Sequence, residues 1–144
     1  MSAIAAMPLA GIVTILAIIL YTMTGLRVGS MRAKHKIDAP AVTGNPEFER
    51  SYRVQLNTLE AMPIFLPSLW LATAYFSARF PIAWWVPAVL GLVWIVGRYM
   101  YMEGYIAAAN KRSTGFLISA LAQYLLMLLA LVAIVMSWPT ATSI

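Results

Sequence analysis

The sequence contains no cysteine and only one histidine, and both absences exclude classes of site. Without cysteine the chain can form no disulfide, no thiolate metal site and no cysteine nucleophile. The single histidine, His35, lies in the basic run RAKHK and has no second histidine with which to share a metal ion. The sequence therefore predicts no catalytic metal, and we interpret His35 as a solvated loop residue rather than a base.

Charged residues are also scarce. They make up 10% of the 144 residues, whereas 62% are hydrophobic, and the mean hydropathy is +0.80. Soluble domains usually carry about 25% charged residues, so this composition is typical of an integral membrane protein. The formal charge of +5 could indicate nucleic acid, but the basic residues are few and lie beside apolar segments. We expect them instead to set the topology and to bind anionic lipid head groups or an anionic small ligand.

Four apolar segments are long enough to cross a bilayer, which takes roughly 20 residues. The expected helices cover about residues 5–26, 52–78, 83–109 and 114–138. The first contains no charge and is too long for the apolar region of a signal peptide, so we expect it to be retained. Ser113 is the expected N-cap of the fourth helix. We predict an all-α membrane protein in which residues 1–144 form one four-helix domain.

The basic residues gather at two of the three connections between these helices. Eight of the ten lie in or beside residues 27–50 and the short NKRS: Arg27, Arg32, Lys34, Lys36, Arg50, Arg53, Lys111 and Arg112. Arg79 marks the second connection. The positive-inside rule then places the first and third connections in the cytoplasm and both termini outside. The short tails, without an endoplasmic-reticulum retrieval signal, favour a bacterial inner membrane.

A polar stripe begins the second predicted helix. Taken at about 100° per residue, Arg53, Asn57 and Glu60 fall within an arc of roughly 60°, while Gln55 points almost the opposite way. A charge near the bilayer centre costs about 2.5–3.5 kcal/mol on insertion scales. Several charges in one such segment therefore need compensation.

A matching stripe follows the third predicted helix into the third connection. Arg98, Tyr101, Tyr105 and Arg112 also fall within roughly 60° of one another, while Glu103 faces elsewhere. Each of the two central helices thus carries polar side chains along one face.

Two interpretations of these stripes are open. In the first, the charges pair with one another: Glu60 with Arg53 or Arg98, or Glu103 with Arg98. In the second, the arginines outnumber their acidic partners and surround a positive, tyrosine-lined recess. Such a recess suits an anionic ligand, because the planar guanidinium binds a carboxylate in bidentate fashion. Glu60 would then take the ligand's ammonium group or hold an arginine in place.

Two blocks of sequence carry these stripes. The first is NPEFERSYRVQLNTLE, residues 45–60, and the second is RYMYMEGYIAAANKR, residues 98–112, which has an arginine seven residues after its last tyrosine. The first block resembles the signature of the MAPEG family, the membrane-associated proteins of eicosanoid and glutathione metabolism. The second resembles a later segment of the same family, whose members include microsomal glutathione transferases and leukotriene C4 synthase. With the four-helix layout, the resemblance covers nearly the whole chain.

The resemblance implies a homotrimer of four-helix subunits with glutathione bound between neighbours as a co-substrate. The residues that match glutathione contacts within one subunit are Arg53, Asn57, Glu60, Tyr101 and Tyr105. Arg32 and Gln55 match family positions that reach the ligand across the subunit boundary. Arg112 matches the arginine that stabilises the glutathione thiolate in the transferase members.

The implied activity is attack of this thiolate on a hydrophobic electrophile dissolved in the bilayer, with reduction of lipid hydroperoxides as a second activity. The alternative is a non-catalytic lipid-binding or scaffold protein of the same fold. The non-enzymatic relative that presents arachidonate to lipoxygenase lacks an arginine at the position of Arg112, so the resemblance favours an enzyme. A small four-helix drug exporter would need an acidic residue in the first helix, and residues 5–26 contain none.

This chain departs from the leukotriene-type enzymes at two positions. Those enzymes have a tyrosine where Ala61 stands, and a second arginine where Ala33 stands. The resemblance therefore implies a general detoxifying transferase rather than a specialised leukotriene synthase.

Overall fold

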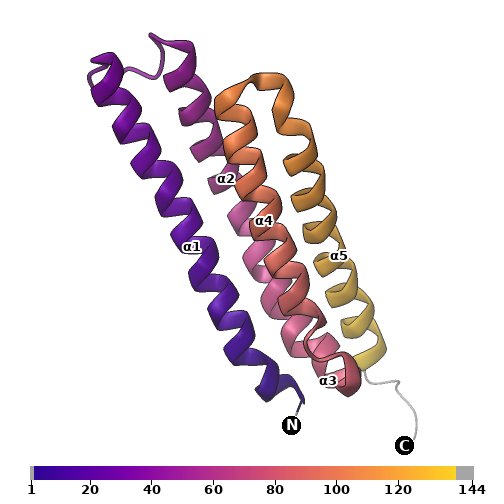
Figure 1. Cartoon of the computed structure of the whole chain (residues 1–144). Coiled ribbons are helices and arrows are strands. Elements are labelled where there is room, and N and C mark those ends of the chain that lie inside the picture. The colour runs from indigo at the N-terminus through magenta and orange to yellow at the C-terminus, as the bar shows by residue number, and fades with distance from the viewer. Residues whose placement is uncertain (1, 139–144) are drawn as a thin grey trace, which may run out of the picture.

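The computed structural model describes residues 2–138 as four long helical rods that run side by side (Figure 1). The long helices are α1 (Ser2–His35), α2 (Pro46–Leu71), α4 (Val86–Ala107) and α5 (Ser113–Ser137). The short helical elements are the π-helix η1 (Ala72–Phe76), α3 (Ser77–Arg79) and the 3-10 helices η2 (Pro81–Ala83) and η3 (Ala109–Arg112). All four rods are long and apolar enough to cross a membrane, which confirms the predicted all-α architecture with four spans.

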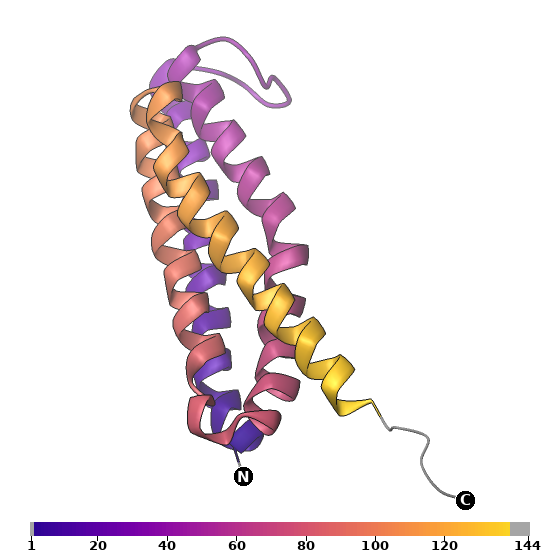
Figure 2. The ribbon, with the colours of Figure 1, turned by 90° about the vertical axis from the view of Figure 1, so that its right-hand side faces the viewer.

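The connections alternate between the two ends of the bundle. Figure 1 shows the α1–α2 connection and η3 at one end, with α3 and the first residues of α1 at the other. The basic residues of the first and third connections therefore share one end. α5 packs along α4, and its far half also contacts η1 as it crosses the bundle (Figure 2).

α1 is longer than the sequence predicted. It continues past residue 26 to His35, so Arg27 and Arg32 are helical rather than part of a loop. The added segment is rich in arginine, methionine, alanine and lysine, which favour helix, and its basic last turn complements the helix dipole. The helix stops where Lys36 adopts a φ of 52°. The apolar run therefore marked the part that crosses the bilayer and not the end of the helix.

α2 also begins earlier than expected, at Pro46 rather than near residue 52. Asn45 is the N-cap, and its Oδ1 accepts a hydrogen bond from the Glu47 backbone N–H at 2.9 Å. Proline at the first helical position fits because its missing N–H would be unpaired there in any case. The Asn-Pro-Glu sequence therefore starts the helix by ordinary capping.

His35 is not the solvated loop residue that the sequence predicted. It lies in the last turn of α1, and its side chain is 19% exposed. Its Nε2 lies 2.9 Å from Glu47 Oε2, which also accepts a hydrogen bond from Lys34 Nζ at 2.7 Å. These contacts fasten the end of α1 to the start of α2, and that is why the ring is held against the bundle.

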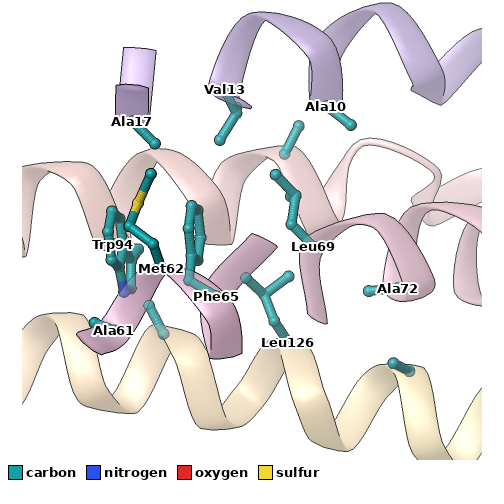
Figure 3. Close-up of a cluster of buried hydrophobic side chains, with 13 residues drawn as sticks. Ala10, Val13, Ala17, Ala61, Met62, Phe65, Leu69, Ala72, Trp94 and Leu126 are labelled. Atoms are coloured by element: carbon teal, nitrogen blue, oxygen red, sulfur yellow. The ribbon is translucent and has the colours of Figure 1, made fainter. Parts of the chain in front are cut away.

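The centre of the bundle holds a flat aromatic stack. The rings of Phe65 on α2 and Trp94 on α4 lie 3.9 Å apart at an angle of 3°, and neither side chain is exposed (Figure 3). Trp94 Nε1 donates a hydrogen bond to Gln123 Oε1 on α5 at 3.1 Å. The buried indole thus satisfies its only donor while it ties α4 to α5.

Two glycines, Gly97 on α4 and Gly115 on α5, allow these helices to pack closely. A Cβ at Gly97 would lie 2.6 Å from the Ser119 backbone nitrogen, and one at Gly115 would collide with the backbone of Tyr101. The backbones of α4 and α5 can therefore approach this closely beside Tyr101 only because both positions lack a side chain.

Gly97→Ala is expected to lower the free energy of unfolding by about 1–3 kcal/mol, the usual cost of overpacking a filled interior. Gly11→Ala is the control, since a Cβ there meets nothing within 4 Å. Titration with sodium dodecyl sulfate in detergent micelles, followed by circular dichroism, measures both. Equal stability of the two variants would contradict the close packing of α4 on α5.

Candidate functional site

An open recess of about 730 Å³ lies among α2, α4, η3 and α5. Its polar lining comes from Asn57, Glu60, Arg98, Tyr101, Arg112 and Gln123. Ile64, Phe116 and Leu117 form apolar walls beside them. One cavity thus joins a positively charged surface to a surface that suits hydrocarbon.

Arg112 reaches the recess through a turn rather than along a helix face. The sequence placed it on the stripe of the third helix, but α4 ends at Ala107, so this helical geometry is wrong. Ala108 is extended, and η3 then reverses the chain. Gly104 permits the reversal, because a Cβ there would lie 2.5 Å from Lys111 O. The turn brings the Arg112 guanidinium over the Tyr105 ring, with Cζ 4.8 Å from the ring centroid.

Ser113 is not the N-cap that the sequence predicted for the last helix. It has helical backbone angles and is the first residue of α5, while Arg112 occupies the cap position without a side-chain hydrogen bond. The cap is unnecessary because η3 runs directly into α5.

A hydrogen bond joins the two predicted stripes. Asn57 Nδ2 on α2 donates to the Tyr101 hydroxyl oxygen on α4 at 2.6 Å. Tyr101 is 2% exposed, and its ring packs edge-on against Tyr105, with centroids 5.6 Å apart. The amide fixes the position of the phenol, whose own proton is left free for another acceptor.

The interpretation in which Glu60 pairs with Arg53 or Arg98 is wrong, as is the pairing of Glu103 with Arg98. Within residues 2–138, the acidic groups that form ion pairs do so with other cations. Glu103 binds Arg27 on α1, with 2.5 Å between Oε1 and Nη2. Glu60 is exposed and lines the recess. The acidic groups therefore do not neutralise the arginines that the sequence placed beside them.

Of the two arginines that line the recess, Arg98 is buried and Arg112 is exposed. Arg98 is only 7% exposed. Within residues 2–138, the buried side-chain polar atoms that lack a hydrogen-bond partner are Nε and Nη1 of this arginine. Its Cζ lies 5.6 Å from the Trp94 ring and 5.2 Å from the Tyr101 ring. Cation–π contacts contribute about 0.5–2 kcal/mol, whereas each unpaired buried polar group costs about 1–3 kcal/mol. The two rings therefore contact the guanidinium but do not satisfy its hydrogen-bond donors.

The other predicted site residues are not among those that line the recess. Arg53 is exposed on α2. Gln55 faces α1, since its Nε2 lies 3.2 Å from where a Cβ on Gly25 would be. Arg32 stands over the Phe48 ring, with Cζ 4.8 Å from the centroid. One chain therefore assembles Asn57, Glu60, Tyr101 and Arg112, with Tyr105 beside them, and leaves Arg32, Arg53 and Gln55 outside.

Gln123 is the recess residue that sequence reasoning missed. It is 7% exposed on α5 and accepts the Trp94 hydrogen bond. The signal was present, because Gln123 is a lone amide deep within an apolar helix.

Comparison with known proteins shows which family this chain resembles. The MAPEG family model matches residues 10–132. Human microsomal glutathione S-transferase 2 is 47% identical over 107 residues, which cover 74% of this chain and 69% of that protein. Guinea-pig (Cavia porcellus) leukotriene C4 synthase is 39% identical over 118 residues, which cover 82% and 75% of the two chains.

A bacterial protein is similar over a larger share of the chain. The uncharacterized protein sll1147 of Synechocystis sp. is 45% identical over 123 residues, 85% of either chain. The family match spans the four apolar helices and both blocks that line the recess. The chain is therefore a multi-pass integral membrane protein that belongs to the MAPEG family.

Proposed function

We propose that this protein is a membrane-bound glutathione transferase, which activates the glutathione thiolate for attack on hydrophobic electrophiles. The observation that carries the proposal is the recess itself, in which Arg112 and the Asn57–Tyr101 pair share one cavity with the apolar walls. A charged tripeptide and an apolar electrophile can meet there. The similarity to a glutathione S-transferase and a leukotriene C4 synthase supports the same reaction class.

Arg112 would act on the thiol. A free thiol has a pKa of about 8.5 and is only about 3% ionised at pH 7. A guanidinium beside the sulfur favours the thiolate through opposite charge. Complete ionisation raises the thiolate concentration only about 30-fold at pH 7, so any larger acceleration comes from orienting the sulfur against the electrophile.

The same proposal covers assembly and location. Residues 1–144 would form one domain of a homotrimer, in which Arg32 and Gln55 contact glutathione in a neighbour's recess while Arg53 and Tyr105 complete the cradle. The basic end would face the cytoplasm, at the inner membrane if the source is bacterial. Lipid hydroperoxides would be alternative second substrates, and anionic head groups would meet the basic end.

The test is binding followed by turnover. Detergent-purified protein should bind glutathione in calorimetry and conjugate it to 1-chloro-2,4-dinitrobenzene. Arg53→Ala should weaken binding, whereas Arg79→Ala, at the opposite end of the bundle, should not. A wild-type protein that binds no glutathione would refute the proposal.

Tyr101→Phe is expected to raise the dissociation constant of glutathione about tenfold, the equivalent of about 1.4 kcal/mol. The substitution removes the acceptor of the Asn57 Nδ2 hydrogen bond, so the amide loses its fixed position. Tyr99→Phe is the matched control, because Tyr99 lies on the same helix but is 48% exposed. Calorimetry on both variants measures the difference, and equal affinities would remove the Asn57–Tyr101 pair from the site.

A further inference from the structure

The reaction proposed above leaves one charge unaccounted for. When the thiolate sulfur bonds to carbon, its negative charge moves onto the electrophile, away from Arg112. A guanidinium at the receiving end would stabilise this charge as an oxyanion hole does. Arg98 lines the same recess as Arg112. It lies on α4, whereas Arg112 lies in η3, which follows the end of α4.

We propose that Arg98 is an oxyanion-binding residue for the second substrate, and that the recess favours apolar α,β-unsaturated carbonyl compounds. This inference rests on the proposed function. It is carried by Arg98, a buried residue that lines the recess and whose guanidinium leaves Nε and Nη1 without hydrogen-bond partners. A carbonyl oxygen that gains charge is an acceptor for such donors.

The surroundings of Arg98 prepare it for this role. The faces of Trp94 and Tyr101 flank the guanidinium, and Gln123 holds the Trp94 indole through a hydrogen bond. Within residues 2–138 no acidic group forms an ion pair with Arg98, although Glu60 lines the same recess. Its donors are therefore positioned before any substrate arrives, and preorganised donors need not reorganise during the reaction.

The apolar walls define the rest of the substrate. Ile64, Phe116 and Leu117 line the recess together with Arg98. An electrophile with a hydrocarbon or aryl body and one oxygen next to its reactive carbons fits both surfaces. A conjugated enone has this form.

In the proposed step, a lone pair of the thiolate forms a C–S bond at the β-carbon of the enone. The C=C π pair moves to the bond between the α-carbon and the carbonyl carbon, and the C=O π pair moves to oxygen. Arg98 donates hydrogen bonds to the resulting enolate oxygen. Water then returns a proton to the α-carbon, which balances the proton that the thiol released to water.

Two electrophiles with similar aryl bodies separate this role from general catalysis. Addition to 4-phenyl-3-buten-2-one places charge on oxygen, whereas displacement from benzyl chloride places it on chloride. Arg98→Met should lower kcat/KM for the enone by about 100-fold, the effect of losing one oxyanion-hole donor. Its kcat/KM for benzyl chloride should fall far less, because no charge develops on oxygen in that reaction. Arg98→Lys should restore part of the enone activity, and Arg79→Met is the control for a lost surface cation.

The outcomes are distinct. An equal loss with both electrophiles, or none with the enone, overturns the role of Arg98 while the transferase function stands. A wild-type protein that binds no glutathione and turns over neither electrophile overturns both proposals.

A wild-type measurement decides the matter if Arg98→Met does not fold. At saturating glutathione, 3-phenylpropionate carries a carboxylate in place of the enolate, at the same distance from the phenyl ring, and 3-phenylpropionamide is its neutral analogue. The carboxylate should inhibit benzyl chloride turnover about tenfold more strongly, because charge-assisted hydrogen bonds exceed neutral ones. Equal inhibition by the two compounds would overturn the inference.

Discussion

Arg112→Ala is expected to lower the conjugation of glutathione to 1-chloro-2,4-dinitrobenzene by about 30-fold or more at pH 7. The first part of this loss is ionisation, since a thiol with its ordinary pKa of about 8.5 is only about 3% thiolate at that pH. The second part is orientation, because the guanidinium that would hold the sulfur over the recess is gone. Steady-state kinetics on detergent-purified protein measure the total.

The pH dependence separates these two parts. Arg112 would hold the pKa of the bound thiol below its usual range, so the wild-type rate should change little above pH 7. In Arg112→Ala the thiol regains a pKa of about 8.5, and the rate should rise about tenfold per pH unit below that value. The deficit should therefore shrink as the pH approaches 9, after subtraction of the uncatalysed reaction. Thiolate absorbance in the ultraviolet reports the same titration directly.

Lys111→Ala is the matched control for Arg112→Ala. Both cations lie in η3 and both are exposed, but only Arg112 lines the recess. The Lys111 variant should keep both the wild-type rate and the wild-type pH profile. If the two variants behave alike, general positive charge at this end of the bundle explains the effect and Arg112 is not the residue that activates the thiol.

The sequence predicted the four spans but misplaced several helix ends, and the physical reason is the same in each case. Hydropathy reports the part of a helix that lies in hydrocarbon, while helix ends are set by local backbone chemistry. α1 stops at the positive φ of Lys36, and α2 starts at the Asn45 cap, both outside the apolar runs. Arg112 came to the recess through a 3-10 turn, which a helical periodicity of 3.6 does not describe.

The pairing of charges could not be predicted from spacing along one helix. Glu103 faces α1 and takes Arg27, which is 76 residues away in sequence. Glu103 therefore does not pair with Arg98, which forms no ion pair within residues 2–138. Such choices depend on how the helices are rotated against one another, which the spacing of residues along one helix does not report.

Mixing two inactive variants is expected to restore activity if the active site spans two subunits. The recess is lined by α2, α4, η3 and α5, without a residue from α1. Arg32 lies on α1, and Gln55 faces α1, so neither reaches the recess of its own chain. Arg32→Ala/Gln55→Ala and Arg112→Ala should each be nearly inactive alone. In a mixed ring, some interfaces join an intact recess to an intact Arg32–Gln55 pair.

Random mixing of equal amounts around a closed ring makes about one quarter of the interfaces intact. Co-expression with two different affinity tags and purification on both isolates the mixed oligomers, whose activity should rise well above that of either variant. Asn57→Leu mixed with Arg112→Ala is the control, because both residues line the recess of a single chain. Every chain in this mixture carries one of the two substitutions in its own recess, so every recess stays defective and activity stays low. No recovery in the test mixture would show that glutathione is held within one chain. Recovery in the control would show that Asn57 and Arg112 do not act in the same recess.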